Sequence, residues 1–426
     1  MGSSAWLLAS AFLVFLMQAG FLCLESGKIR SKNNINVAAK NLADFIIAAI
    51  AFWAFGFGIM FGESASGVIG ASEFFFGAQH SAWQYSFFLF QLMFCGTAAT
   101  LMSGAVAERM SFSGYIAISV ILCCLIYPLV GHWAWASLFN PDNPGWLESL
   151  GFVDFAGSTV VHSVSGWVAL ASIIVIGPRL GRFDKKRKQP SASNMPFSVL
   201  GTLLIWLGWF GFNGGSALSL SDNVPAIILN TCLAGAWGGL AATLTCRMLC
   251  GYVDVSYMLN GVIAGLVAIT ASADVASPVA TMLVGTGGGL VMVAGVWLLE
   301  RFRIDDVLTV VPVHLGAGVF GTLAVPFCVS ALPEGLSLIG FLGVQLLGIT
   351  VIGVFSFVSS LSILLALQRF ITLRVSARDE LMGMNISEHH ASTEIIDLLR
   401  VMKMQSRRGN FTRRMPVEPF TEVGQI

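Results

Sequence analysis

Apolar runs of about 20 residues or more recur along this chain, and they constrain its fold more than any other feature. As a continuous α-helix, such a run is long enough to cross a hydrocarbon layer of about 30 Å. Over the 426 residues, 56% are hydrophobic and only 11% are charged, a composition that leaves too little polar surface for a water-soluble protein. We therefore predict an all-α integral membrane protein.

We predict eleven transmembrane helices, of which the last is unusually long. Basic residues follow the first apolar run and no small-residue cleavage pattern accompanies it, so we interpret this run as a membrane helix rather than a signal peptide. The expected spans are 4–24, 38–61, 84–107, 112–136, 157–176, 196–216, 223–246, 255–273, 277–299, 307–327 and 336–368.

The distribution of the 23 Lys and Arg residues predicts the orientation of the chain. With eleven spans all of them fall on one side, and loops retained in the cytoplasm are the ones that carry Lys and Arg. We therefore expect a multi-pass protein of the cell (inner) membrane, with the N-terminus outside and the C-terminus cytoplasmic. Spans 1 to 5 and spans 6 to 10 then run in opposite directions across the membrane, as inverted repeats must. The eleventh span lies outside the two repeats.

One motif occurs twice, and the two copies are 152 residues apart. From Asp154 the chain has DFAGSTVVHSVSG, and from Asp306 it has DVLTVVPVHLGAG. In both copies a histidine follows the acid by eight residues, His162 in the first and His314 in the second, and a glycine follows each histidine by four. A motif repeated in this way indicates two related halves that meet at their histidines.

A lone histidine in an apolar segment is more often a hydrogen-bonded core residue than a functional group. Two histidines at matching positions of inverted repeats are expected to meet near the membrane midplane, where they can share one N–H···N hydrogen bond. Burial opposes charging an imidazole, so we expect both to be neutral at rest. Such a pair suits either a neutral, hydrogen-bonding permeant or one proton passed along it.

Two features inside the spans predict helix contacts rather than chemistry. The first span contains a face of small residues around Gly20, which is suited to close helix packing in lipid. Lys40 and Asp44 lie one helical turn apart in the second span, and we predict an intramembrane ion pair between them.

Enzymatic chemistry, metal binding and nucleic-acid binding find no support in the sequence. The two histidines lack the third and fourth ligands that zinc normally takes, and the eight cysteines show no CxxC pair. Ser163 and Ser165 flank His162, but no glycine-flanked nucleophile elbow is present. Lys and Arg balance Asp and Glu at 23 each, which gives no reason to expect nucleic acid. We expect no enzyme activity, no cofactor and no metal.

Several stretches together resemble the ammonium transporter (Amt/Mep/Rh) family. They are DFAGSTVVH, AERMSFSG, GWFGFNGGS, MLNGVIAGLVAIT and VPVH, and with the eleven spans the resemblance covers about residues 5–390. It implies a pseudosymmetric bundle that assembles as a homotrimer in the lipid bilayer, with a pore in each protomer. The implied ligand is ammonium or ammonia, with methylammonium as an analogue.

The resemblance also implies roles for individual residues. Ammonium would be recruited at the outer mouth and deprotonated near a phenyl gate, and ammonia would then pass the histidines, with separate relay of the proton as one option. The matching residues are Phe94, Trp135 and Ser216 with Asp154 behind them at the recruitment site, Phe94 and Phe212 at the phenyl gate, and His162, His314 and Trp209 along the pore. Pro312 departs from the family, which has a small residue there; it lacks a backbone N–H, so we expect a reshaped lumen.

Beyond about residue 385 the composition changes to that of a soluble segment, so we divide the chain into a transmembrane domain, 1–384, and a cytoplasmic tail, 385–426. Asn385 to Glu388 fits a capping box. Asn385 and His390-Ala391 depart from the family's tail motif, which weakens the expectation of capture by PII-type signal proteins. Ile395, Leu398, Leu399 and Met402 form a predicted apolar stripe on an amphipathic helix.

The ending PFTEVGQI resembles the connectors that precede output domains in bacterial signalling proteins. Two hypotheses therefore stand side by side. In one, the chain is an ammonium sensor or transducer, with or without transport, cut before an output domain such as a histidine kinase or a diguanylate cyclase. In the other, it is a conventional ammonium transporter or channel with an ordinary cytoplasmic tail.

Overall fold

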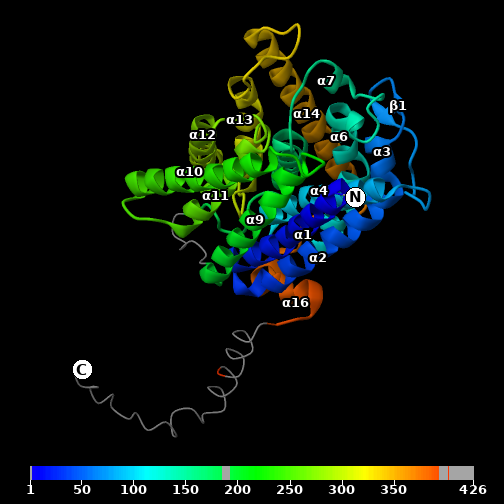
Figure 1. Cartoon of the computed structure of the whole chain (residues 1–426). Helices are drawn as coiled ribbons and strands as arrows, with labels where there is room; N and C mark the ends of the chain where they lie inside the picture. Colours follow the sequence, from blue (N-terminus) through cyan, green and yellow to red (C-terminus); the bar gives the residue numbers. More distant parts are fainter. Residues whose placement is uncertain (1, 185–191, 393–401, 403–426) are drawn as a thin grey trace, which may run out of the picture.

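The computed structural model describes residues 2–184, 192–392 and 402, and these form a bundle of long helices (Figure 1). Within them, nine helices are long and apolar enough to cross a membrane, and two shorter apolar segments, Val255–Ile269 and Val311–Phe327, complete the eleven predicted spans. Most of the predicted apolar stripe, apart from Met402, and the connector-like ending lie outside the described residues.

The spans of the first half are α1 (Gly2–Lys28), α2 with α3 (Asn34–Ala51 and Phe57–Phe61), α4 (Ala82–Val106), α5 with α6 (Phe112–Ile121 and Tyr127–Trp135), and α8 (Val164–Ile176). The remaining spans are α9 (Met195–Gly215), α10 (Val224–Cys250), α11 (Val255–Ile269), α12 (Pro278–Arg301), α13 (Ala317–Ala324) and the long α14 (Leu338–Leu367). Three short helices, α7 (Trp146–Ser149), α15 (Ala377–Met382) and α16 (Met384–His389), and a two-stranded antiparallel ladder of β1 (Ser64–Ala65) and β2 (Ile69–Gly70), lie in the connections.

Four spans contain a segment of π-helix, a wider turn that is often found at functional sites. Phe52–Gly56 joins α2 to α3, and Leu122–Ile126 joins α5 to α6. Ser158–Ser163 precedes α8, and Val311–Gly316 precedes α13. The last two segments carry the two histidines.

Several spans begin at a side chain that accepts a hydrogen bond from the first helical turn. Ser81 and Gln84 form a reciprocal capping box at α4, and Asn194, Asp254 and Ser277 accept from N–H groups of α9, α11 and α12. These caps satisfy donors that have no partner within the helix. They explain why the spans begin close to where the apolar runs begin.

The first spans of the two halves, α1 and α9, pack against each other in antiparallel directions through glycines. A Cβ on Gly20 would lie 2.7 Å from Ile205, one on Gly201 would lie 2.4 Å from the backbone of Leu24, and one on Gly208 would lie 2.2 Å from Met17. The small-residue face predicted around Gly20 is therefore confirmed. The fifth spans of the two halves are also in contact, through a hydrogen bond of 2.7 Å between Thr159 and Thr322.

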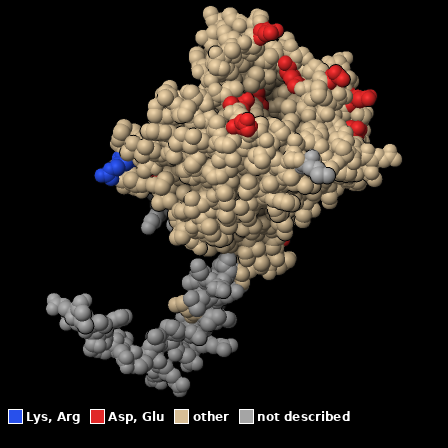
Figure 2. Space-filling model, in the orientation of Figure 1, with Lys and Arg blue, Asp and Glu red and all other residues tan. Residues whose placement is uncertain are grey.

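Charge is distributed unequally between the two ends of the bundle. Figure 2 shows acidic side chains, without Lys or Arg among them, over the end that carries α7 and β1 in Figure 1. Around the bundle, large apolar side chains are exposed on several helices, for example Leu42, Leu244, Leu283 and Val354. A wall of this kind suits contact with lipid or with a neighbouring subunit rather than with water.

Two local predictions are wrong. Lys40 does not pair with Asp44: its Nζ donates to the backbone oxygen of Met110 at 2.9 Å, while Tyr115 and Ser119 donate to the Asp44 carboxylate. Polar groups on neighbouring helices therefore replace the expected partner one turn away.

The expected capping box at Asn385 is also absent, because α16 begins one residue earlier and has no side-chain cap. Asn385 is buried, where its amide donates to the backbone oxygen of Ser31 and its oxygen accepts from the N–H of Asn36. The end of the described chain therefore packs on the bundle.

Candidate functional site

Two phenylalanine rings from different spans are stacked near the end of the bundle that carries α7. Phe94 of α4 and Phe212 of α9 are stacked with ring centroids 3.9 Å apart and planes 12° apart. Both side chains are buried. Rings in van der Waals contact leave no space between them, so passage requires the rings to move. The structure therefore brings together the two rings that the family resemblance assigns to a phenyl gate.

A small cavity lies against this stack. Its volume is ≈ 10 Å³, about the space that one water molecule needs. The Trp135 ring centroid lies 6.3 Å from that of Phe94, in an edge-to-face arrangement. Ser216 donates its hydroxyl proton to the Phe212 carbonyl at 2.9 Å, so the oxygen still has a lone pair to accept another hydrogen bond. The lining residues are Phe90, Gln91, Phe94, Trp135, Leu138, Phe155, Ser216 and Leu218.

Asp154 lies behind this cavity rather than in its lining. Its carboxylate accepts backbone N–H bonds from residues 157–160, at 2.8 to 3.1 Å. Its backbone carbonyl accepts the indole N–H of Trp135 at 2.8 Å. Gly157 makes this turn with φ +106°, and a Cβ there would lie 2.9 Å from the Trp135 ring. Asp154 therefore begins the histidine-bearing segment and positions Trp135.

The two histidines meet on the side of the Phe94–Phe212 stack that faces away from α7. Their Nδ1 atoms are 3.3 Å apart, so one ring donates and the other accepts, as predicted from the repeated motif. His162 Nε2 is buried and has no hydrogen-bond partner among the described residues. The His162 ring stacks on Trp209 at 4.9 Å, and Trp209 in turn donates its indole N–H to Thr270 at 2.9 Å.

The second copy of the motif has the same architecture with fewer bonds. Asp306 Oδ2 accepts the backbone N–H of Val311 at 2.7 Å, at the start of the π-helical segment that carries His314. Pro312 lies inside that segment, where it packs against Gly295 of α12. The acid of each motif thus acts as a helix cap, a role that the spacing of acid and histidine did not reveal.

A second small cavity, of ≈ 20 Å³, lies beside the histidine pair, on the side away from the ring stack. His314 is part of its lining, together with three polar residues that the motif search missed, Glu25, Lys28 and Asn260. These lie at the inner ends of α1 and α11, so only the packing of distant spans brings them to His314. The remaining lining residues are Phe21, Leu24, Leu101, Ile263, Leu308, Val310 and Val313.

Comparison with known proteins identifies the chain. A model of the Ammonium Transporter Family matches residues 5–394. The chain belongs to the ammonium transporter family. A Synechocystis protein that carries the name of an ammonium transporter is 50% identical, over 99% of this chain and 79% of its own length. The ammonium transporter Amt2 of Archaeoglobus fulgidus is 38% identical over 91% of this chain and 86% of its own length.

Solved structures of the family have the same fold. The structure of a protein called Sensor Amt Protein superimposes with a TM-score of 0.88 at 40% identity, covering 91% of this chain and 98% of that one. Mep2 of Saccharomyces cerevisiae gives a TM-score of 0.80 at 25% identity, covering 88% of both chains. The predicted fold class is confirmed, and the prediction that the chain is not an enzyme agrees with its membership of a transporter family.

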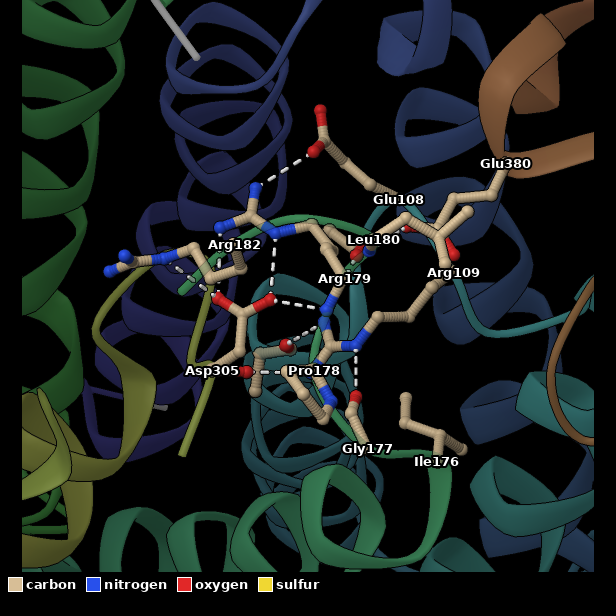
Figure 3. Close-up of polar contacts among 12 residues, drawn as sticks. Glu108, Arg109, Ile176, Gly177, Pro178, Arg179, Leu180, Arg182, Asp305 and Glu380 are labelled. Carbon is tan, nitrogen blue, oxygen red and sulfur yellow. Dashed lines mark hydrogen bonds and ion pairs between the residues drawn. The ribbon is translucent and has the colours of Figure 1, made fainter. Parts of the chain in front are cut away.

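At the opposite end of this ammonium transporter family member, Arg179 joins the two halves (Figure 3). It follows α8 and donates to Glu108 of the first half at 2.7 Å and to Asp305 of the second half at 2.8 and 2.9 Å. Arg30 forms a further ion pair with Glu108. Sequence reasoning missed this cluster because its members lie in four separate connections.

The cluster keeps its carboxyl groups charged. Burial alone would raise the pKa of Glu108, but the hydrogen bond from Arg30 and the charges of Arg179 and Arg30 outweigh it and lower the pKa to about 2. For Asp305, burial is likewise outweighed by the hydrogen bond and charge of Arg179, and the pKa falls to about 2. The same partners raise the pKa of Arg179 against the effect of burial. The ion pairs therefore persist at physiological pH.

The described end of the chain docks next to this cluster. Glu380 accepts the backbone N–H of Leu180 at 2.6 Å and pairs with Arg374, whose guanidinium also donates to the carbonyls of Ile176 and Pro178. Lys32 donates to the Glu380 carbonyl at 2.6 Å. The segment that carries α15 therefore contacts both the connection between the halves and the connection after α1.

Proposed function

We propose that this chain binds ammonium at the cavity formed by Phe94, Trp135 and Ser216, and that ammonia passes through a pore in each protomer. The observation that carries the proposal is the sequence of groups along one path, in which an aromatic cavity leads to a closed ring stack and then to a buried imidazole pair.

The chemistry of the cavity suits a small cation with N–H donors. Aromatic faces attract such a cation by about 0.5 to 2 kcal/mol each, and the Ser216 oxygen accepts one N–H. On the inner side of Phe212 the path is lined by buried, neutral groups, where an unescorted ion meets a large desolvation cost. Deprotonation at the gate removes that cost, and ammonia then exchanges hydrogen bonds with His162 and His314.

The assembly we propose is a homotrimer in the cell (inner) membrane, with the end that carries α7 and β1 outside and the C-terminus in the cytoplasm. The concentration of Lys and Arg at the opposite end supports this orientation. We also propose the division into a transmembrane domain, 1–384, and a cytoplasmic tail, 385–426.

Flux into proteoliposomes tests the transport proposal. Ammonium, and methylammonium as its analogue, should each produce a current or an internal pH change that equal concentrations of potassium do not. An equal response to potassium would contradict the selectivity, and no response to any of the three would contradict transport.

A second function, ammonium sensing, is favoured by the likeness to Sensor Amt Protein and by the docking of α15 and α16 on the bundle. A sensor needs a ligand that prefers one of two arrangements, and it has no need of flux. Ammonium should then change amide hydrogen exchange in residues 377–392 relative to potassium. Free conduction with unchanged exchange in that segment would exclude sensing through the tail.

A further inference from the structure

We propose that Glu25 is the proton acceptor on the inner side of the histidine pair, so that it takes up the proton that ammonium leaves behind. The inference rests on the proposed passage of ammonia and adds to it a path for the proton. It is carried by the position of Glu25 and by the bonding of its two carboxylate oxygens.

Glu25 is the only carboxylate in the lining of the cavity that also touches His314. Its side chain is buried, with 3% of the residue exposed, at the inner end of α1. The cavity volume of ≈ 20 Å³ is enough for about one water or ammonia molecule. A molecule of that size would lie between the imidazole and the carboxylate and could bridge them by hydrogen bonds.

Only one oxygen of Glu25 is engaged by the surrounding helices. Oε2 accepts the amide of Asn41 at 2.8 Å and the hydroxyl of Ser103. No hydrogen bond reaches Oε1 from the residues that the structure describes, and this atom lies against Gly104, where a Cβ would be 3.1 Å from it. Oε1 therefore keeps its lone pairs for a proton or a bridging molecule.

Two other buried carboxylates, those of Asp44 and Asp154, differ in this respect. The two oxygens of the Asp44 carboxylate accept one hydrogen bond each, from Tyr115 and from Ser119. Both oxygens of the Asp154 carboxylate accept hydrogen bonds from backbone N–H groups. Those two groups are fully bonded to the fold. Glu25 is bonded on one side and open to the pore on the other, which is what a residue that changes protonation state requires.

The histidine pair can supply the proton. Ammonium at the gate gives its proton to His162 Nε2, which has no other partner, and leaves as ammonia. The hydrogen bond between the Nδ1 atoms passes one proton to His314, and His314 releases one from its other nitrogen towards the cavity. The Glu25 carboxylate takes it up as a carboxylic acid, and returns to carboxylate when it gives the proton to water at the inner end.

The charged neighbours of Glu25 favour this return. Lys28 lies in the same cavity wall, held by a hydrogen bond of 2.8 Å from its Nζ to Asn260, and Lys40 of α2 is the other nearby cation. Neither is within ion-pair distance of Glu25 among the described contacts. The two cations stabilise the carboxylate through their charge, and Lys28 also interacts electrostatically with Asp306 and Asp254.

The test compares Glu25→Gln with a matched variant, Asp44→Asn, in proteoliposomes on a solid support. Glutamine keeps an oxygen for Asn41 and Ser103 but cannot take up a proton. The ammonium-elicited current of Glu25→Gln should fall by about 100-fold, the low end of what a positioned proton acceptor contributes. Asp44→Asn changes a buried carboxylate away from the pore and should conduct like the wild type. An equal, wild-type current in both variants would overturn the assignment.

Infrared difference spectroscopy of the wild-type protein gives a second test that does not depend on a stable variant. Ammonium, but not potassium, should produce the carbonyl band of a protonated carboxylic acid, and this band should shift in Glu25→Asp and in heavy water. Absence of the band from a conducting wild type would overturn the inference while leaving transport intact. A wild type that does not conduct would overturn the proposed transport, and this inference with it.

Discussion

His162 has one ring nitrogen that is hydrogen-bonded and one that has no partner among the described residues. The Nδ1 atoms are joined at 3.3 Å, whereas His162 Nε2 has no partner among the described residues. A buried polar atom without a partner costs free energy, so its retention points to use by a ligand or a proton. In this respect the pair differs from histidines that merely complete a core.

Replacing either histidine with alanine should change conduction and leave assembly intact. The rings of His162 and His314 line the proposed path, and their ring contacts are with each other and with Trp209 and Phe212 of the same protomer. We expect ammonium currents to fall by at least about tenfold, with an unchanged elution volume in detergent gel filtration. Wild-type currents in both variants would remove the pair from the mechanism.

Asp154→Ala should lose ammonium uptake because the variant loses the cap of the segment that carries His162. Each backbone N–H left unpaired in a buried site costs about 1 to 3 kcal/mol, and Asp154 serves four of them. A lower melting temperature should accompany the loss. Gel filtration separates a misfolded variant from a folded, inactive one, and a folded variant with normal uptake would contradict the role of Asp154.

The proximity of the stacked rings and of the two histidines could be predicted because these residues lie in short motifs, each within one span. The positions of Glu25 and Arg179 could not be predicted, although both side chains are largely buried. Their roles depend on partners in distant spans, and sequence periodicity fixes which face of a helix is apolar but not which helix it meets. Lys40 and Asp44 show the opposite error, since a favourable spacing along one helix was overridden by partners on its neighbours.

At the level of elements, glycines set the distance between α1 and α9. Gly201→Leu should push these helices apart, because even a Cβ at this position would lie 2.4 Å from backbone atoms of Leu24. Overpacking of this kind costs about 1 to 3 kcal/mol, so the melting temperature should fall.

The matched control is Gly343→Leu in α14, where a Cβ would meet no atom within 4 Å. A helix gains stability when glycine is replaced, so this variant should melt at or above the wild-type temperature. If both variants melt alike, close packing of α1 on α9 does not limit the stability of the bundle.

The positions of the spans were predictable, whereas the interruptions within them were not. The length of the apolar runs alone was enough to locate all eleven spans. A single segment in lipid must satisfy its own backbone hydrogen bonds, and the α-helix does so. The π-helical segments that carry His162 and His314 depend on caps from Asp154 and Asp306 and on packing against other spans. Hydropathy contains no information on either.

For the whole molecule, the cluster around Arg179 should make stability fall at acidic pH. The pKa of Glu108 is about 2 in the folded protein against an ordinary 4.5, and that of Asp305 is about 2 against 3.8. Because both folded values are lowered, the unfolded chain takes up protons first as the pH falls. The stabilisation is therefore complete above about pH 5 and is lost progressively between about pH 4.5 and 2.

Arg179→Met isolates this contribution, because the variant removes the guanidinium that both carboxylates share. Breaking a buried ion pair by removing one partner costs about 3 to 5 kcal/mol, so the variant should melt at a lower temperature at neutral pH. Its two carboxyl groups should no longer have such low pKa values, and its melting temperature should depend less on pH below 4.5 than that of the wild type. Arg179 also joins the two halves of the bundle. If the melting temperatures of variant and wild type change with pH in the same way over this range, the ion pairs do not hold the halves together, and helix packing alone does.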